Sequence, residues 1–272
     1  MLNIRKPNNL STPPHDGKEI VYALKRAEFK AYYQPKVELS SLELSGLEVL
    51  ARWQHPCSSL LTPDKFLPSV KAAGLLNDLT HSLLYQALTT HNSLMRAAIN
   101  APMALNLETS QIGDGDFICS LIAQANIHGF RTKPLTIEIT ESGIEPFTSP
   151  HMIRNIAKLN ACGWRLSLDD FGTGHSSLER LCQIPCSEIK IDQSFTQHML
   201  SDMRYQKIVK YIIAIGKAMQ LTVVAEGIET FQQLNFLQSL GCDQGQGYIF
   251  SPALSAEDIQ QWCFRWNRAA LL

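Results

Sequence analysis

Long apolar runs are missing from this sequence, and stretches such as residues 211–215 are among the longest present. A helix that crosses a membrane needs roughly 18 consecutive apolar residues, so none is predicted. Residues 1–14 contain no apolar segment of signal-peptide length. We therefore expect a cytoplasmic protein.

Charged residues are few, and the cysteines form no metal-binding motif. Charged residues make up 18% of the chain and the formal net charge is -1. No global field then attracts nucleic acid or anionic lipid, so an anionic ligand must be bound by local groups or metal ions. The seven cysteines form no CxxC pair, and the closest two, Cys182 and Cys186, lack histidines at zinc-site spacing. We interpret all seven as reduced.

What the sequence does contain is an alternation of short apolar runs with longer helical patterns. Residues 1–16 predict a tail or linker remnant, and residues 17–272 predict one domain. The predicted strands are residues 31–38, 45–53, 103–107, 135–139, 165–168, 188–191, 221–225 and 247–250. The predicted helices are residues 20–29, 75–95, 116–128, 152–161, 204–219, 231–240 and 256–266. Eight strands alternating with helices over about 250 residues are typical of a (β/α)8 TIM-like barrel.

The first two predicted strands depart from a regular barrel. Only the polar segment 39–44 lies between them, which is too short for a helical crossover. They should pair as an antiparallel hairpin, because parallel strands need a connection of a dozen or more residues. The α/β barrel is therefore expected to contain one antiparallel strand near the N-terminus.

Polar side chains recur at or near the ends of these strands. They are Glu48, Arg52, Asn106, Glu138, Asp169, Asp170, Lys190, Asp192, Glu226 and Gln246. In a TIM-type barrel the carboxyl ends of the strands meet at one mouth, where active sites lie. Each residue alone could be a helix cap, a turn residue or a surface charge. Their recurrence at intervals of about one strand–helix unit favours a shared site.

The carboxylates of this set require compensation. They are Glu48, Glu138, Asp169, Asp170 and Glu226. Burying like charges close together costs several kcal/mol, so the groups either take up protons or hold cations. Carboxylate and amide oxygens suit Mg²⁺, Mn²⁺ or Ca²⁺ better than zinc. Strand alternation also places Arg52 on the face of Glu48, so a metal ligand and a phosphate-binding guanidinium could share the mouth.

Asp169 and Asp170 are adjacent, so their side chains would diverge in a regular strand. They precede the loop 171–177, whose Gly172 and Gly174 indicate unusual backbone geometry. A backbone turn there could bring both carboxylates to neighbouring metals, although the pair could also serve ordinary turn chemistry.

Eight short segments together resemble the EAL domain family, which is named for a Glu-Ala-Leu signature. They are YQP (33–35), GLEVLARW (46–53), LNL (105–107), EITES (138–142), DDFGTG (169–174), IKID (189–192), VAEGIET (224–230) and QGY (246–248). The resemblance extends from about residue 32 to residue 254. It implies a (β/α)8-like barrel with one reversed strand that cleaves c-di-GMP to the linear dinucleotide pGpG.

The resemblance also implies a role for each matching residue. The implied metal ligands are Glu48, Asn106, Glu138, Asp169 and Asp170. They would hold two ions, Mg²⁺ or Mn²⁺, with Asp169 bridging both. The implied catalytic residues are Glu48, Lys190, Glu226 and Gln246. Lys190 and Glu226 would position the attacking water. The implied nucleotide contacts are Gln34, Leu50, Arg52 and Tyr248. Glu141 would anchor the loop that follows Asp170.

Three departures from the family pattern bear on activity. Val49 replaces the alanine of the signature, but it should face away from the mouth and be tolerated. Glu108 stands where the family usually has a small serine, and strand geometry would place this extra acid on the face of Asn106. His175 replaces a common aromatic residue. These changes leave open a catalytically weak or inactive EAL domain that acts as a c-di-GMP receptor.

The partners implied by the resemblance are c-di-GMP, a second copy of the barrel in a homodimer, and a regulatory sensor or receiver domain or partner protein. No nucleic acid polymer is implied. A metal phosphodiesterase for another nucleotide is a further alternative.

Overall fold

The structure is a computed structural model that describes residues 15–130, 135–140, 149–173 and 177–269. Its strands are β1 (Phe29–Glu38), β2 (Leu44–Gln54), β3 (Leu60–Leu61), β4 (Met103–Leu107), β5 (Leu135–Thr140), β6 (Arg165–Phe171), β7 (Glu188–Ile191), β8 (Thr222–Ala225) and β9 (Gln244–Gly245). Its helices are α1 (Gly17–Lys25), α2 (Pro63–Ala72), α3 (Leu76–Arg96), α4 (Thr109–Gly113), α5 (Gly115–Ile127), α6 (Pro150–Ala161), α7 (Ser177–Gln183), α8 (Gln193–His198), α9 (Met203–Ala218), α10 (Phe231–Leu240) and α11 (Ala256–Ala269).

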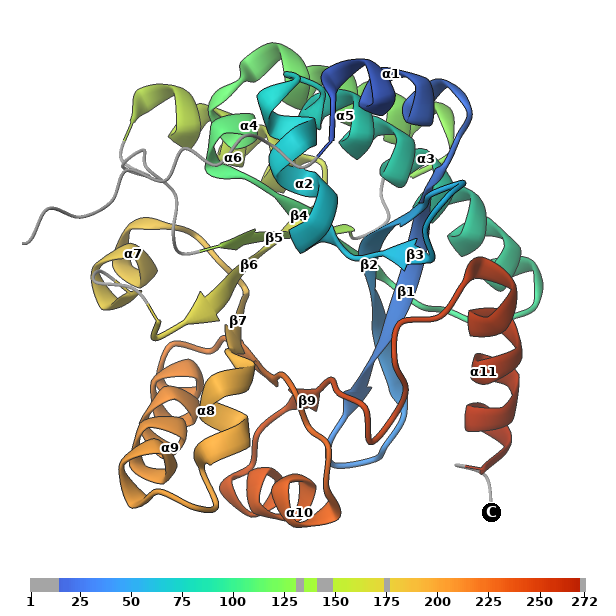
Figure 1. Cartoon of the computed structure of the whole chain (residues 1–272). Helices are drawn as coiled ribbons and strands as arrows, with labels where there is room; N and C mark the ends of the chain where they lie inside the picture. The colour runs from blue at the N-terminus through green and yellow to red at the C-terminus, as the bar shows by residue number, and fades with distance from the viewer. Residues whose placement is uncertain (1–14, 131–134, 141–148, 174–176, 270–272) are drawn as a thin grey trace, which may run out of the picture.

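The strands close into a barrel surrounded by helices (Figure 1). Neighbouring strands follow the order β1-β9-β8-β7-β6-β5-β4-β2, and β1 pairs with β2 to complete the ring. Strand β1 runs antiparallel to both of its neighbours, whereas β2 and β4 to β9 pair in parallel around the rest of the ring. The expected hairpin and the barrel fold are confirmed. Strand β3 lies outside the ring and pairs with the end of β2.

The predicted strands coincide with β1, β2 and β4 to β8 to within three residues at each end. The predicted strand 247–250 is wrong, because these residues form a turn and the strand is β9. The apolar residues of this segment are compatible with a strand, but Gly247 packs on the backbone of Ile228. A Cβ atom on Gly247 would lie 2.1 Å from the carbonyl oxygen of Ile228. The chain therefore turns where the pattern predicts extension.

The predicted helix 20–29 is also wrong at its end, since α1 stops at Lys25. Ala27 has a φ of 52°, a left-handed conformation that breaks the helix, and Phe29 already belongs to β1. Sequence patterns missed α2, α4, α7 and α8. The helices α4, α7 and α8 have seven residues or fewer, and α2 carries an internal proline, Pro68. Short segments and internal prolines obscure helical periodicity.

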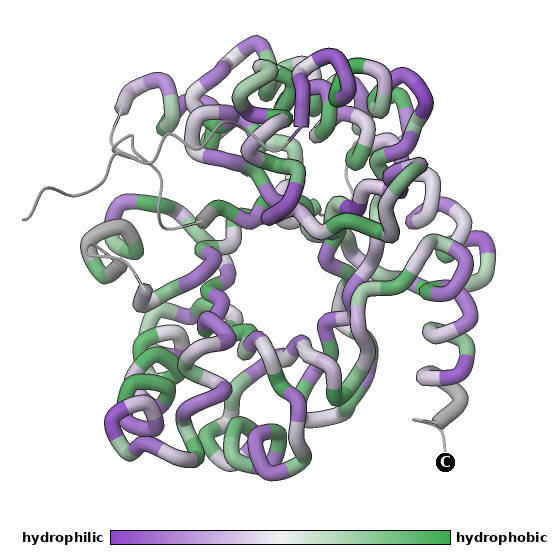
Figure 2. The backbone as a smooth tube through the Cα atoms, viewed as in Figure 1, coloured by the Kyte–Doolittle hydropathy of each residue, from purple (hydrophilic) through white to green (hydrophobic). Residues whose placement is uncertain are grey.

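The main apolar core lies between the strands and the surrounding helices. Helix α3 buries one stripe, which includes Leu84, Ala87, Leu88 and Leu94. Val49 of β2 is buried and belongs to the same apolar cluster. In Figure 2, hydrophilic residues are interspersed with hydrophobic ones along the ring of strands. Strands buried on both faces are usually near-continuous hydrophobic runs, so the polar residues indicate a specialised interior.

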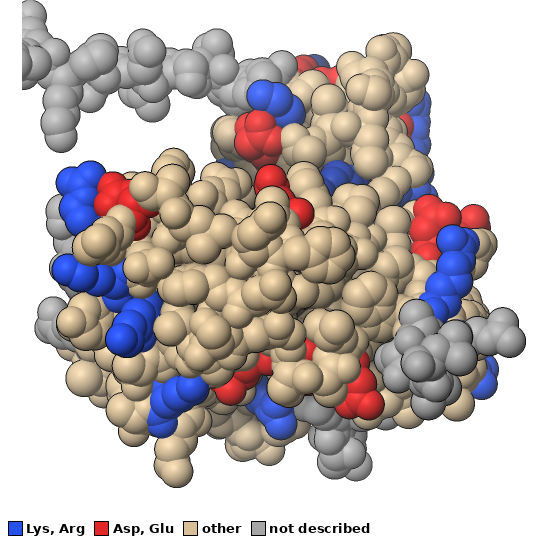
Figure 3. Space-filling view, turned by 90° about the horizontal axis from the view of Figure 1, so that it is seen from below, with Lys and Arg blue, Asp and Glu red and all other residues tan. Residues whose placement is uncertain are grey.

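The surface shows no accumulation of one charge on the face in Figure 3, where basic and acidic residues are scattered around a broad uncharged area. This distribution agrees with the formal net charge of -1. In the described ranges, no helix combines the length and apolarity needed to cross a membrane. All seven cysteines are free.

Candidate active site

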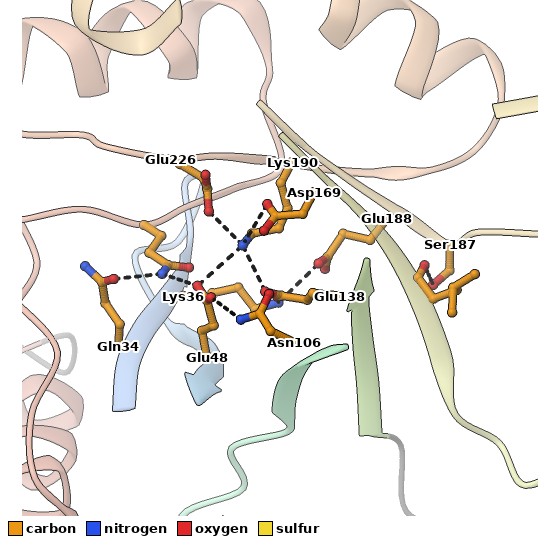
Figure 4. Close-up of polar contacts among 12 residues, drawn as sticks. Gln34, Lys36, Glu48, Asn106, Glu138, Asp169, Ser187, Glu188, Lys190 and Glu226 are labelled. Atoms are coloured by element: carbon orange, nitrogen blue, oxygen red, sulfur yellow. Dashed lines mark hydrogen bonds and ion pairs between the residues drawn. The ribbon is translucent and has the colours of Figure 1, made fainter. Parts of the chain in front are cut away.

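The ammonium group of Lys190, on β7, is fully buried among four carboxylates at the mouth of the barrel (Figure 4). Its Nζ atom lies 2.7 Å from Glu226 Oε1 and 2.9 Å from Glu138 Oε2. It lies 3.2 Å from Asp169 Oδ1 and 3.4 Å from Glu48 Oε2. The acids come from β2, β5, β6 and the residue after β8. The barrel therefore brings together residues that are far apart in the sequence.

Electrostatics at this cluster indicate a shortage of positive charge. Burial opposes ionisation of Lys190, but the surrounding carboxylates outweigh it and hold the pKa of Lys190 well above its ordinary value. Burial and neighbouring acids raise the pKa of Glu138, and also that of Glu226, to about 8. For Glu48 burial is outweighed by Lys190 and two amide donors, which lower its pKa to about 2. Lys190 therefore does not hold Glu138 and Glu226 at the ordinary pKa of a glutamate.

Two amide side chains fix the orientation of Glu48. Asn106 Nδ2 donates to Glu48 Oε1 over 2.8 Å, and Gln246 Nε2 donates to Glu48 Oε2 over 2.6 Å. Gln246 Nε2 also donates to Gln34 Oε1 over 2.9 Å, and Gln34 Nε2 donates to the carbonyl oxygen of Ser251. The Oε1 atom of Gln246 is buried without a partner among the described residues. It can accept a hydrogen bond from a ligand or water.

The backbone turns sharply at Asp170, which has a φ of 55°. The pairing of β6 with β7 is irregular between Leu168 and Phe171, so the strand does not continue its alternation there. Carboxylate oxygens of Asp169, Asp170 and Glu226 consequently lie within 4.8 Å of one another. Burial and the charge of Asp169 raise the pKa of Asp170 to about 6. This turn brings the two adjacent aspartates to one place.

A second buried lysine, Lys36, was missed by the sequence analysis. Its Nζ atom lies 3.3 Å from Glu138 Oε1 and 3.2 Å from Glu188 Oε1. The signal was present, since strand alternation places Lys36 on the face of Gln34 and Glu188 on the face of Lys190. A lysine and a glutamate within strands otherwise suggest solvent-facing positions.

The donor set fits divalent cations. The carboxylates are Glu48, Glu138, Asp169, Asp170, Glu188 and Glu226. These six groups face the two ammonium groups of Lys36 and Lys190, so full ionisation would leave four negative charges unbalanced. Two divalent cations supply that charge. The oxygens of Asp169, Asp170 and Glu226 are already close enough to share an ion, and oxygen ligands are those that Mg²⁺ and Mn²⁺ prefer.

A cavity of about 670 Å³ adjoins these residues. Glu48, Asn106 and Asp169 lie along one part of its wall, and Leu50 and other apolar residues of β2, α2, α3 and β4 line much of the rest. A cavity of this size accommodates a small-molecule ligand. The mouth therefore combines a cation-binding cluster with an apolar recess.

The sequence model that defines the EAL domain family matches residues 18–253 of this chain. The chain belongs to the EAL domain family. The cyclic di-GMP phosphodiesterase RocR of Pseudomonas aeruginosa is 35% identical, over 90% of this chain and 62% of RocR. The oxygen sensor protein DosP of Escherichia coli is 33% identical, over 90% of this chain and 31% of DosP. This EAL domain therefore spans less than two thirds of RocR and about a third of DosP.

Solved EAL structures share the fold. The structure of the MucR phosphodiesterase of P. aeruginosa in complex with c-di-GMP superimposes with a TM-score of 0.83 at 33% identity. The match covers 89% of this chain and 98% of that chain. Both the resemblance noted from sequence motifs and the barrel fold are confirmed.

The structure of this EAL domain describes two further sequence-predicted residues, Arg52 and Tyr248. Arg52 is half-buried, and its guanidinium carbon lies 5.9 Å from the centre of the Tyr32 ring. Tyr248 is 70% exposed in the turn that replaces the predicted last strand. Glu141 and His175 lie outside the described residues.

Glu108 follows Leu107, the last residue of β4, in an extended conformation, and it lines the same cavity as Asn106. It stands at the N-cap of α4, where its backbone N–H donates to the side-chain Oε1 atom of Gln111, and it forms an ion pair with Lys71. Although Glu108 lines the cavity, its charge has a partner of its own. The extra acid therefore adds no uncompensated charge to the cluster.

In metal-free protein, we expect the free energy of unfolding to fall as the pH rises from about 5 to about 8. Glu138 and Glu226 have native pKa values of about 8, against an ordinary value of 4.5. The native state therefore binds more protons than the unfolded state in this window, and stability falls with rising pH. Urea unfolding in EDTA at several pH values measures the slope. Replacing both residues by glutamine should flatten it, and a rising slope in the unmodified protein would contradict the assignment.

Proposed function

We propose that this EAL domain hydrolyses c-di-GMP to linear pGpG with two divalent ions, Mg²⁺ or Mn²⁺, and so lowers the level of this second messenger. The observation that carries the proposal is the cluster of four carboxylates around Lys190, set beside a cavity of ligand size. The names of two relatives support it, since RocR is a c-di-GMP phosphodiesterase and the MucR structure contains c-di-GMP.

The proposed metal ligands are the oxygen donors of the cluster. Glu48, Asn106, Glu138 and Asp169 would hold one ion, and Asp169 and Asp170 would hold the second. When bound, the two ions supply positive charge that neutralises the phosphodiester and favours ionisation of water at neutral pH. Asn106 already donates to Glu48, so its side chain would present its carbonyl oxygen to the ion.

Lys190 and Glu226 would hold the attacking water. The two side chains are 2.7 Å apart, so one water can contact both at the edge of the cluster. The ammonium group would donate to the oxygen of the water, and the carboxylate would accept a proton from it. The unpartnered Oε1 atom of Gln246 would accept a hydrogen bond from the other O–H group of the water, while its Nε2 atom keeps Glu48 in place.

The nucleotide would lie across the mouth. Arg52 would pair with a phosphate, and Leu50 would contact a base from the wall of the cavity. Gln34 and the exposed Tyr248 would contact the nucleotide from the strand β1 side. Glu141 would anchor the loop after Asp170. A homodimer through the barrel and control by a sensor or receiver domain belong to the same proposal.

The test is product analysis after incubation with c-di-GMP and Mg²⁺ or Mn²⁺. We expect pGpG to form, and we expect EDTA or the Glu48→Ala variant to abolish it. Glu43→Ala, at an exposed glutamate in the loop between β1 and β2, is the matched control and should retain activity. Intact c-di-GMP after long incubation, with binding confirmed by calorimetry, would overturn hydrolysis and establish a receptor. Turnover of a different cyclic dinucleotide in preference to c-di-GMP would correct the substrate.

A further inference from the structure

Lys36 lies one layer below the mouth of the barrel, on β1, and is only 4% exposed. Its ammonium group connects two carboxylates, Glu188 and Glu138, at 3.2 Å and 3.3 Å (Figure 4). A buried charge is costly unless it is paired, and both of these partners are themselves buried. The sequence therefore maintains a charged link beneath the site rather than an apolar filling.

Gly46 of β2 pairs directly with Lys36 of β1. A Cβ atom on Gly46 would lie 3.6 Å from Lys36 Cε, an ordinary van der Waals contact, and 3.1 Å from the carbonyl oxygen of Pro102. The lysine stem therefore runs alongside this glycine, which itself packs closely on the backbone of Pro102.

Each oxygen of the Glu138 carboxylate contacts a different lysine. Lys36 contacts Oε1 from below, and Lys190 contacts Oε2 at 2.9 Å within the cluster. Glu138 is fully buried, so these two cations restrict the rotation of its carboxylate. Lys36 touches none of the other carboxylates of the mouth within ion-pair distance, whereas Lys190 touches four in the described structure.

We propose that Lys36, held by Glu188, is a positioning residue that orients Glu138 as a ligand for a divalent cation. The inference rests on the metal-dependent hydrolysis proposed above. A partner that fixes a ligating carboxylate from outside typically contributes about 10- to 100-fold to metal affinity. Lys36 would act in this way through Glu138, without contacting the substrate.

The test uses the double variant Lys36→Met/Glu188→Met, which removes the pair without changing the net charge. We expect its affinity for Mn²⁺, measured by electron paramagnetic resonance on protein stripped of metal, to fall by about 10- to 100-fold. We expect kcat to fall with it and KM for c-di-GMP to change less. Ser167→Ala is the matched control. Ser167 is buried in the same layer of β6, and its hydroxyl has no partner in the described part of the chain.

An unfolding temperature recorded without metal separates positioning from a structural role. A structural role alone would lower this temperature and leave the Mn²⁺ affinity of the folded protein unchanged, which would overturn the inference. If the double variant fails to fold, Glu188→Gln is measured in the same way. It keeps Lys36 but weakens its anchor, and unchanged Mn²⁺ affinity there would equally overturn the inference. If the unmodified protein shows neither Mn²⁺ binding nor hydrolysis, the proposed function itself fails.

Discussion

Replacing Lys190 by methionine should reduce turnover by at least about 10²- to 10³-fold, the usual cost of removing one preorganised charge-stabilising group. It should also lower the free energy of unfolding of metal-free protein by about 3–5 kcal/mol, because removing one partner of a buried ion pair leaves uncompensated charge. The four carboxylates around Nζ lose the cation that they share. Mn²⁺ should restore part of the lost stability, since it binds the native cluster and not the unfolded chain.

Urea unfolding in EDTA and in Mn²⁺, together with a c-di-GMP hydrolysis assay, measures both effects. Lys65→Met is the matched control, because Lys65 is an exposed lysine that pairs only with its neighbour Asp64 among the described residues. A surface substitution of this kind should change the unfolding free energy by no more than about 0.5 kcal/mol. Equal stability of Lys190→Met and the unmodified protein in EDTA would show that the cluster does not depend on Lys190.

Asp169→Asn should separate activity from stability. We expect turnover to fall by about 10³-fold or more, because Asp169 is proposed to bridge both ions and an amide provides only a neutral ligand. The free energy of unfolding in EDTA should stay the same or rise by about 1 kcal/mol, because one of several crowded negative charges is removed. Asp169 has Asp170 and Glu226 within reach. We thus expect this metal-binding carboxylate to lower the free energy of unfolding of the metal-free protein.

Asp114→Asn provides the control for this substitution. Asp114 caps α5 away from the cluster, and asparagine is an equally good N-cap. This variant should retain both activity and stability. If Asp169→Asn instead destabilises the metal-free protein by several kcal/mol, the carboxylate has a structural role that the proposed mechanism does not assign to it.

Much of the site was predictable because the carboxyl ends of successive barrel strands lie close together in space. Glu48, Glu138 and Lys190 could be grouped by their places on predicted strands, before any geometry was available. The convergence on Lys190 Nζ was not predictable, since it depends on side-chain reach and on the register between strands. A backbone turn that brings both aspartates together was likewise only one of two interpretations of the adjacent pair, and the structure shows a left-handed conformation at Asp170.

The errors have physical causes of the same kind. Periodicity cannot distinguish an apolar turn from a short strand, so it failed at Gly247, where close backbone packing decides. A charged residue within a strand suggests solvent, so Lys36 and Glu188 were overlooked although each lies two residues from a recognised site residue. Local contacts of this type outweigh the sequence pattern.

The pairing of the first strand with the last has a consequence for biosynthesis. Val37 and Gly245 are 208 residues apart in the sequence and become neighbours only after residue 245 has been made, and such distant pairings form slowly. The hydrogen bonds from Gln246 to Gln34 and Glu48 depend on that same closure. A growing or truncated chain that lacks β9 and the residues after it would hold all six carboxylates of the site but lack the hydrogen bonds from Gln246. Maturation of the site and completion of the fold are therefore one event.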